Sequence, residues 1–76
     1  MKPAVVNHIS PKKLLNTKWT AVKPVNREKH FLVTAVHRDA FQHPVTVTLE
    51  AVHTRRETAM HWRELRDAGR WKAGWH

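Results

Sequence analysis

Two neighbouring stretches decide the fold: HFLVTAVHR at residues 30–38 and VTVTLEAVHT at residues 45–54. Both are rich in β-branched residues, which favour strands, and the loop between them, residues 39–44, ends in a proline. The second stretch alternates apolar and polar side chains, which is typical of a strand with one buried face. That face is expected to carry Val45, Val47, Leu49 and Ala51.

Two further strands are predicted on either side of this pair. Residues 18–22 alternate in the same way until Pro24 and Asn26 break the pattern, and residues 58–63 form the last strand. A tight turn at residues 55–56 would join the third and fourth strands, although two arginines are not favoured in a two-residue hairpin turn.

Side-chain parity sets the expected register, because residues opposite each other in a sheet share a face. Pairing Val33 with Leu49 places Ala35 opposite Val47, and a two-residue turn places Met60 opposite Ala51. The other face is mixed and includes Leu32, Val36 and Val52, whereas one face is entirely apolar and carries Phe31, Val33, Ala35, Val45, Val47, Leu49, Ala51, Met60 and Trp62.

Short helical turns are expected at both ends of the sheet. Ser10 can cap a turn over residues 10–15, Pro11 fits its first position, and Asn16 tolerates the left-handed conformation that ends it. A second turn is expected from residue 62 to about Gly69. The predicted fold is mostly β: a four-stranded antiparallel meander, or the same meander curled into a small SH3-like barrel. Residues 1–9 are predicted to be a disordered tail and residues 10–76 a single tryptophan-rich domain.

Composition excludes several classes of protein. The chain has 76 residues, 14 Lys and Arg against 6 Asp and Glu, and no Cys, so disulfides, thiolate metal sites and a cysteine nucleophile are excluded. Without an apolar run of about 18 residues, a cytoplasmic protein that does not enter membranes is expected. The net charge of +8 is uneven, because residues 1–27 carry +6, residues 28–67 carry none and residues 68–76 carry +2.

Five segments together resemble a known family. They are KLLNTKWTAV at 13–22, NREKHF at 26–31, LEAVHTRRE at 49–57, WREL at 62–65 and WKAGW at 71–75. In this order they resemble a family of small tryptophan-rich bacterial proteins that is known as a domain of unknown function. The resemblance covers about residues 11–75 and implies one compact domain, but it implies no activity, cofactor or catalytic residue.

Two groups of residues are candidates for binding a nucleic acid. Arg27, Lys29, Arg55 and Arg56 lie in turns that an antiparallel meander brings to one edge, where arginine can bind phosphate or form salt bridges with Glu28 and Glu57. Near the end of the chain, two tryptophans four residues apart would share one helical face beside two cations, either as a stacking platform or as a lid over the sheet. These residues are Arg70, Trp71, Lys72 and Trp75, whereas Trp19 and Trp62 are expected in the core.

Catalytic and metal sites find little support in the sequence. His30, Glu50 and His61 share a face and are of the types that bind zinc or iron, but they are offset and have no tight ligand spacing. The only serine is Ser10, and no glycine-rich phosphate loop or placed pair of carboxylates occurs. We therefore expect no enzyme activity, no metal and no cofactor.

The expected function is a binding module. Its basic surface favours RNA or a ribonucleoprotein as partner, and the alternative is a protein–protein adaptor whose tryptophans and basic turns meet an acidic protein surface. No membrane partner is expected. An unpaired edge strand makes either a monomer or a weak dimer the expected state.

Overall fold

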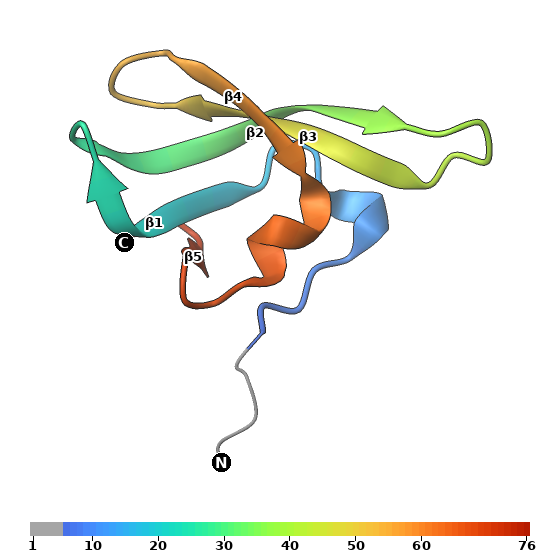
Figure 1. Cartoon of the computed structure of the whole chain (residues 1–76), viewed down its shortest axis with the longest axis horizontal. Helices are drawn as coiled ribbons and strands as arrows, with labels where there is room; N and C mark the ends of the chain where they lie inside the picture. Colours follow the sequence, from blue (N-terminus) through green and yellow to red (C-terminus); the bar gives the residue numbers. More distant parts are fainter. Residues whose placement is uncertain (1–5) are drawn as a thin grey trace.

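Five antiparallel strands and two short 3-10 turns make up the computed structural model, which describes residues 6–76. The strands form one open sheet in the order β4-β3-β2-β1-β5 (Figure 1). The strands are β1 (Lys18–Val25), β2 (Glu28–Arg38), β3 (Pro44–Ala51), β4 (Glu57–His61) and β5 (Trp71–Ala73), and the turns are η1 (Pro11–Lys13) and η2 (Trp62–Arg66).

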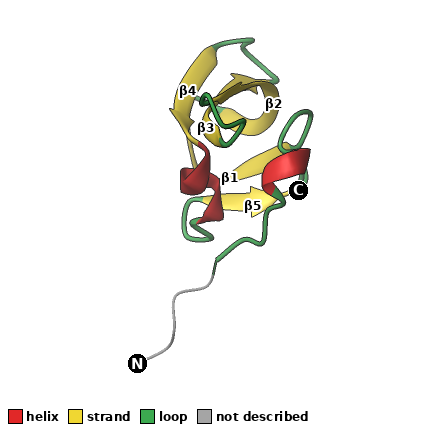
Figure 2. Cartoon of the chain, turned by 90° about the vertical axis from the view of Figure 1, so that its right-hand side faces the viewer, coloured by secondary structure: helices red, strands yellow, loops and turns green. Residues whose placement is uncertain are grey.

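The predicted mostly-β meander is confirmed, and a fifth strand extends it. β5 has only three residues and pairs with β1, where Trp71 lies opposite Ala21. The sheet is curled (Figure 2), but β4 and β5 occupy its two edges, so it is an open sheet rather than a closed barrel. The part of the chain that the structure describes has no helix long and apolar enough to cross a membrane.

The predicted register between β2 and β3 is confirmed for its first half only. Val33 lies opposite Leu49 as predicted, but the register shifts between Val33 and Ala35. Val36, rather than Ala35, therefore lies opposite Val47, and the predicted pairing of Ala35 with Val47 is wrong. An irregularity of this kind inserts one residue into a strand and moves every later side chain to the other face.

The predicted two-residue turn between β3 and β4 is also wrong. Met60 lies opposite Val47 instead of Ala51, and a longer loop over residues 52–56 replaces the turn. The Arg55 amide donates to the Ala51 carbonyl at 2.8 Å, and Arg55 has a φ of 64°. The shift is by an even number of residues, so Met60 keeps its predicted face, while Trp62 leaves the strand and begins η2.

The core lies between the concave side of the sheet and the two turns. Trp19 and Trp62 are buried in it, as predicted. Val45 was expected to be buried but is 37% exposed, because it lies near the start of β3. The buried apolar residues are Leu14, Trp19, Phe31, Val33, Val47, Leu49, Ala51, Trp62, Leu65 and Trp71.

Hydrogen bonds fix the first residues of the described chain. The Asn7 side-chain amide donates to the Leu65 carbonyl at 2.7 Å and to the Trp71 carbonyl at 2.9 Å, and Val6 pairs with Asp67. Residues 1–5 of the predicted tail lie outside the described residues, whereas residues 6 and 7 are held against η2 and β5. The predicted turn forms as η1 but is shorter than expected, and the Ser10 side chain makes no capping hydrogen bond to it, so that part of the prediction is wrong; Asn16 follows the turn with a φ of 66°.

Candidate functional site

The sheet brings two basic connections to the same end of the molecule. The β1–β2 turn and the β3–β4 loop lie together there, opposite the β2–β3 loop (Figure 1). The antiparallel order of the strands causes this arrangement, because β2 begins where β3 ends. Arg27, Lys29, Arg55 and Arg56 therefore come to this end, where the sequence predicted a shared edge.

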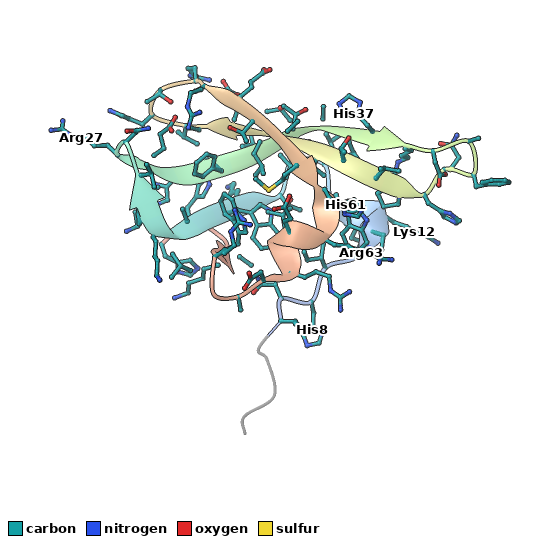
Figure 3. All side chains as sticks on the ribbon, viewed as in Figure 1. His8, Lys12, Arg27, His37, His61 and Arg63 are labelled. Carbon is teal, nitrogen blue, oxygen red and sulfur yellow. The ribbon has the colours of Figure 1, made fainter. Side chains whose placement is uncertain are left out.

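The β1–β2 turn holds an arginine in an unusual conformation. Val25 pairs with Glu28, so the turn has two central residues, and both have positive φ: 56° at Asn26 and 62° at Arg27. This is the conformation of a type I′ turn, whose second position favours glycine. Arg27 is exposed and projects outward from the end of the molecule (Figure 3).

Arg56 has a structural partner at this end. Its guanidinium binds the carboxylate of Glu28, with Nε 3.1 Å from each carboxylate oxygen, and the Thr54 hydroxyl donates to the same carboxylate. The Glu28 side chain is almost completely buried. The hydrogen bond from Arg56, followed by that from Thr54, lowers the pKa of Glu28 from 4.5 to about 2. This cluster ties the β3–β4 loop to the start of β2.

The other predicted salt-bridge partner is not used. Arg55 pairs with Glu50 at 3.5 Å instead of with Glu57, which makes no ion pair in the part of the chain described. Arg70, which was predicted to flank an aromatic platform, pairs with Glu64 at 3.0 Å. Three of the six predicted cations are thus engaged by carboxylates. The Arg55 and Arg70 side chains are mostly exposed, so their two pairs contribute little to stability, unlike the pair of Arg56 with the buried Glu28.

Trp71 and Trp75 do not form a shared platform. Trp71 is 6% exposed and packs edge-on against Phe31 at 5.2 Å between ring centroids, whereas Trp75 is 42% exposed. The prediction of a common face assumed a helix. Residues 71–73 are a strand instead, and Gly74 then turns the chain with a φ of 86°.

The Trp75 ring is held in a fixed place with cationic neighbours. Its Nε1 donates to the Phe31 carbonyl at 2.9 Å. The Lys18 Nζ lies over the ring, 4.8 Å from its centroid, and the His30 ring is 6.1 Å away. Lys72 lies in the same row of the sheet as His30, because both are opposite Thr20. A partly exposed aromatic ring therefore has a lysine ammonium over it and an imidazole beside it.

A shallow groove of about 630 Å³ adjoins this ring at the β1–β2 turn. We call it the cationic groove, and its lining residues are Arg27, Lys29, His30, Val52 and His53. No carboxylate lines it, and neither Arg27 nor Lys29 makes an ion pair within residues 6–76. His30 connects the groove to Trp75, since it lines the one and contacts the other.

Sequence reasoning identified part of this site and missed the rest. Lys18 and His53 were not candidates, and His30 was considered only as a metal ligand. The alternation in β1 could have indicated Lys18, because it precedes the buried Trp19 and is therefore expected on the exposed face. Nothing in the sequence indicates that His53 lines the same groove as Arg27.

The metal hypothesis has no geometric support. His61 lies opposite Thr46, whereas Glu50 lies opposite Glu57 at the other end of the β3–β4 ladder. Among the described residues no group of three potential ligands comes together.

A second set of cations lies away from the groove. Lys12 and Arg63 are on the opposite side of the molecule, beside η1 and η2, together with His61 (Figure 3). Substitutions on this surface change the net charge of the protein without changing the groove.

Comparison with known proteins places the chain in a family. The family described as Tryptophan-rich protein (DUF2389) matches residues 17–76. Neither the curated proteins nor the solved structures contain a match.

Proposed function

Because the chain belongs to the tryptophan-rich protein family DUF2389, whose function is unknown, we propose a function from the geometry of its surface. We propose that it is a non-catalytic module that binds single-stranded RNA. One observation carries the proposal: within residues 6–76, the cations that line the groove are unpaired and no carboxylate lines it, and its His30 lies against a tryptophan ring that is 42% exposed.

The cations of the groove suit a phosphate backbone. Arg27 and Lys29 are exposed and unpaired within the described chain, so a phosphate need not displace a carboxylate from them. Each neutralised phosphate of a single strand releases bound counterions and adds about 0.7 to the slope of log affinity against log salt. Arg55 and Arg56 contribute less in this proposal, because Glu50 and Glu28 already bind them.

Trp75 suits an unpaired base. Stacking of a base on an aromatic ring contributes about 1–3 kcal/mol and tolerates any base. The hydrogen bond to the Phe31 carbonyl holds the ring in place before binding, which limits the entropy lost on stacking. Since a paired base is not available to stack on such a ring, the proposal specifies a single strand.

The conformation of Arg27 supports a role outside folding. A left-handed conformation costs an ordinary residue about 1–2 kcal/mol, and glycine would avoid this cost. The Arg27 side chain makes no hydrogen bond or ion pair within residues 6–76 that offsets it. Strained residues often occur at binding sites, and the place of Arg27 beside the groove, rather than its conformation alone, supports such a role.

Fluorescence anisotropy tests the proposal with a labelled oligouridylate of about eight nucleotides, over a series of salt concentrations. The double variant Arg27→Ala/Lys29→Ala is expected to bind more weakly and to lower the salt slope by about 1.4, for two lost phosphate contacts. The matched control, Lys12→Ala/Arg63→Ala, removes the same charge from the other side of the molecule and is expected to change binding far less.

Two results would contradict the proposal. The first is an equal loss of affinity in the two double variants, which would make binding a matter of net charge alone. The second is the absence of any binding to the oligonucleotide at low salt, together with a protein partner that survives nuclease treatment in a pull-down. That second result would favour the adaptor function, in which Trp75 and the basic turns contact an acidic protein.

A further inference from the structure

A second cavity, separate from the cationic groove, opens on the core side of the sheet. It has a volume of about 290 Å³ and lies between the second half of β1, the start of β2, the β3–β4 loop and the residues before β5. The cavity exists because the pairing of β1 with β2 is interrupted between Thr20 and Val25. In this interval β1 is bonded instead to the segment before β5, where the Val22 amide donates to the Arg70 carbonyl at 2.9 Å.

One wall of the cavity contains a buried donor without an acceptor. Trp71 lines the cavity, and its Nε1–H is the sole buried side-chain polar atom without a hydrogen-bond partner in the part of the chain described. Buried indole N–H groups normally have an acceptor, so an unpaired one calls for an explanation. Trp75, by contrast, satisfies its indole with the Phe31 carbonyl.

The charges around the cavity are mostly positive. Lys23, Arg56 and Arg70 line it together with one acid, Glu28, whose carboxylate is already bound by Arg56. Arg70 pairs with Glu64, which does not line the cavity, and Lys23 makes no ion pair among the described residues. Lys23 is therefore the cation that an anion meets without competing with a carboxylate among the described residues, whereas Arg70 would be shared with Glu64.

The remaining walls are apolar. Phe31 and Trp71 meet edge to face at 5.2 Å between ring centroids, and the cavity borders both of them. A ligand site usually combines such apolar walls with a few converging polar groups. The combination here suits a molecule with a flat apolar body and an anionic group.

We propose that this cavity binds a small organic anion, in the class of aromatic carboxylates. The apolar ring of the ligand packs against Phe31 and Trp71, and the carboxylate meets Lys23 and Arg70. Because the Trp71 Nε1–H is buried in the absence of ligand, the proposal requires a small shift of the indole ring that brings this N–H to a carboxylate oxygen. The site does not depend on the cationic groove, because the two share no lining residue.

Nuclear magnetic resonance tests the site with benzoate as the probe and benzamide as its neutral counterpart. The chain has four tryptophans, and their indole N–H signals report each ring separately. Benzoate is expected to shift the Trp71 indole signal saturably, with a dissociation constant on the order of millimolar for a ligand of this size. Benzamide is expected to bind at least about tenfold more weakly, because it lacks the charge.

Two variants connect the signal to the cavity. Lys23→Ala removes an exposed side chain and is expected to weaken benzoate binding by about tenfold without unfolding the protein. Lys12→Ala, on the other side of the molecule, removes the same charge and is expected to leave the benzoate titration unchanged.

Three results would overturn the proposal. They are the absence of a saturable Trp71 shift well above millimolar benzoate, equal binding of benzoate and benzamide, and a benzoate shift confined to Trp75. The RNA proposal is tested by the binding of an oligonucleotide to Trp75 and the cationic groove instead. Failure of either proposal therefore leaves the other standing.

Discussion

Replacing Arg27 by glycine is expected to stabilise the protein and weaken its binding to RNA. Arg27 has a φ of 62° in a turn where glycine is favoured. Relief of the left-handed conformation gains about 1–2 kcal/mol, and the greater freedom of glycine in the unfolded chain takes back about 0.5–1 kcal/mol. The net gain is about 0–1.5 kcal/mol, and its midpoint of about 0.75 kcal/mol corresponds to a rise in Tm of roughly 3–6 °C for a domain of this size.

Binding is expected to move in the opposite direction. Arg27→Gly removes one of the two cations of the cationic groove that have no ion pair in the described part of the chain, so affinity for single-stranded RNA falls and the salt slope decreases by about 0.7. Thermal unfolding followed by circular dichroism measures the stability, and fluorescence anisotropy measures the binding.

Gln42→Gly is the matched control for this variant. Gln42 also has a left-handed conformation, with a φ of 65°, but it lies in the β2–β3 loop at the opposite end of the sheet. The same gain in stability is expected there, with unchanged affinity and salt slope. The reasoning is refuted if Arg27→Gly binds RNA as tightly as the original protein, or if Arg27→Gly lowers Tm while Gln42→Gly raises it.

Four further results are expected. Trp75→Ala removes the exposed ring and should weaken RNA binding about 5- to 150-fold in anisotropy titrations, and an affinity within twofold of the original would contradict stacking. Hydrogen bonds from Arg56 and Thr54 lower the pKa of Glu28 from 4.5 to about 2, so its contribution to stability is complete above pH 4.5 and is lost as the pH falls through about 2. Glu28→Gln should remove this loss from a plot of Tm against pH. If the fall of Tm at acid pH were the same in the variant, the ion pair would not be its cause. Asn7→Ala removes two hydrogen bonds to carbonyls and should cost roughly 1–3 kcal/mol in urea unfolding, whereas no change would show that residues before η1 do not stabilise the fold. Leu49→Ala empties a fully buried site and should cost about 2–5 kcal/mol by the same measurement, a smaller loss meaning that the core collapses around it.

The alternation of apolar residues was sufficient to predict most of the sheet. Val47, Leu49 and Ala51 are buried on the face that their spacing indicates, and Val33 lies opposite Leu49 as parity requires. Alternation predicts these positions because successive side chains of a strand point to opposite faces of the sheet, and here one of the two faces is buried.

The errors arose where local geometry interrupts that periodicity. The irregularity near Thr34 changes the partner of Val47, and the Arg55-Arg56 pair forms part of a longer loop because neither residue favours a tight turn. β5 has three residues and takes its strand conformation from pairing with β1, so its own sequence carries no period.

The candidate site was predictable in its location and less so in its members. Antiparallel pairing alone placed the turns of Arg27 and Arg56 at one end. Which arginine is free depends on the buried carboxylate of Glu28, and burial is a property of the packed structure. The separation of Trp71 from Trp75 likewise depends on a strand and a glycine turn where the spacing indicated a helix.

A map of backbone and indole chemical shifts during titration with an oligouridylate tests the central claim most directly. The account predicts that the largest changes occur at Arg27, Lys29, His30, His53 and the indole of Trp75, and that they diminish as salt is added. Changes centred instead on the surface of η1 and η2, or shifts absent from the groove at low salt, would contradict it.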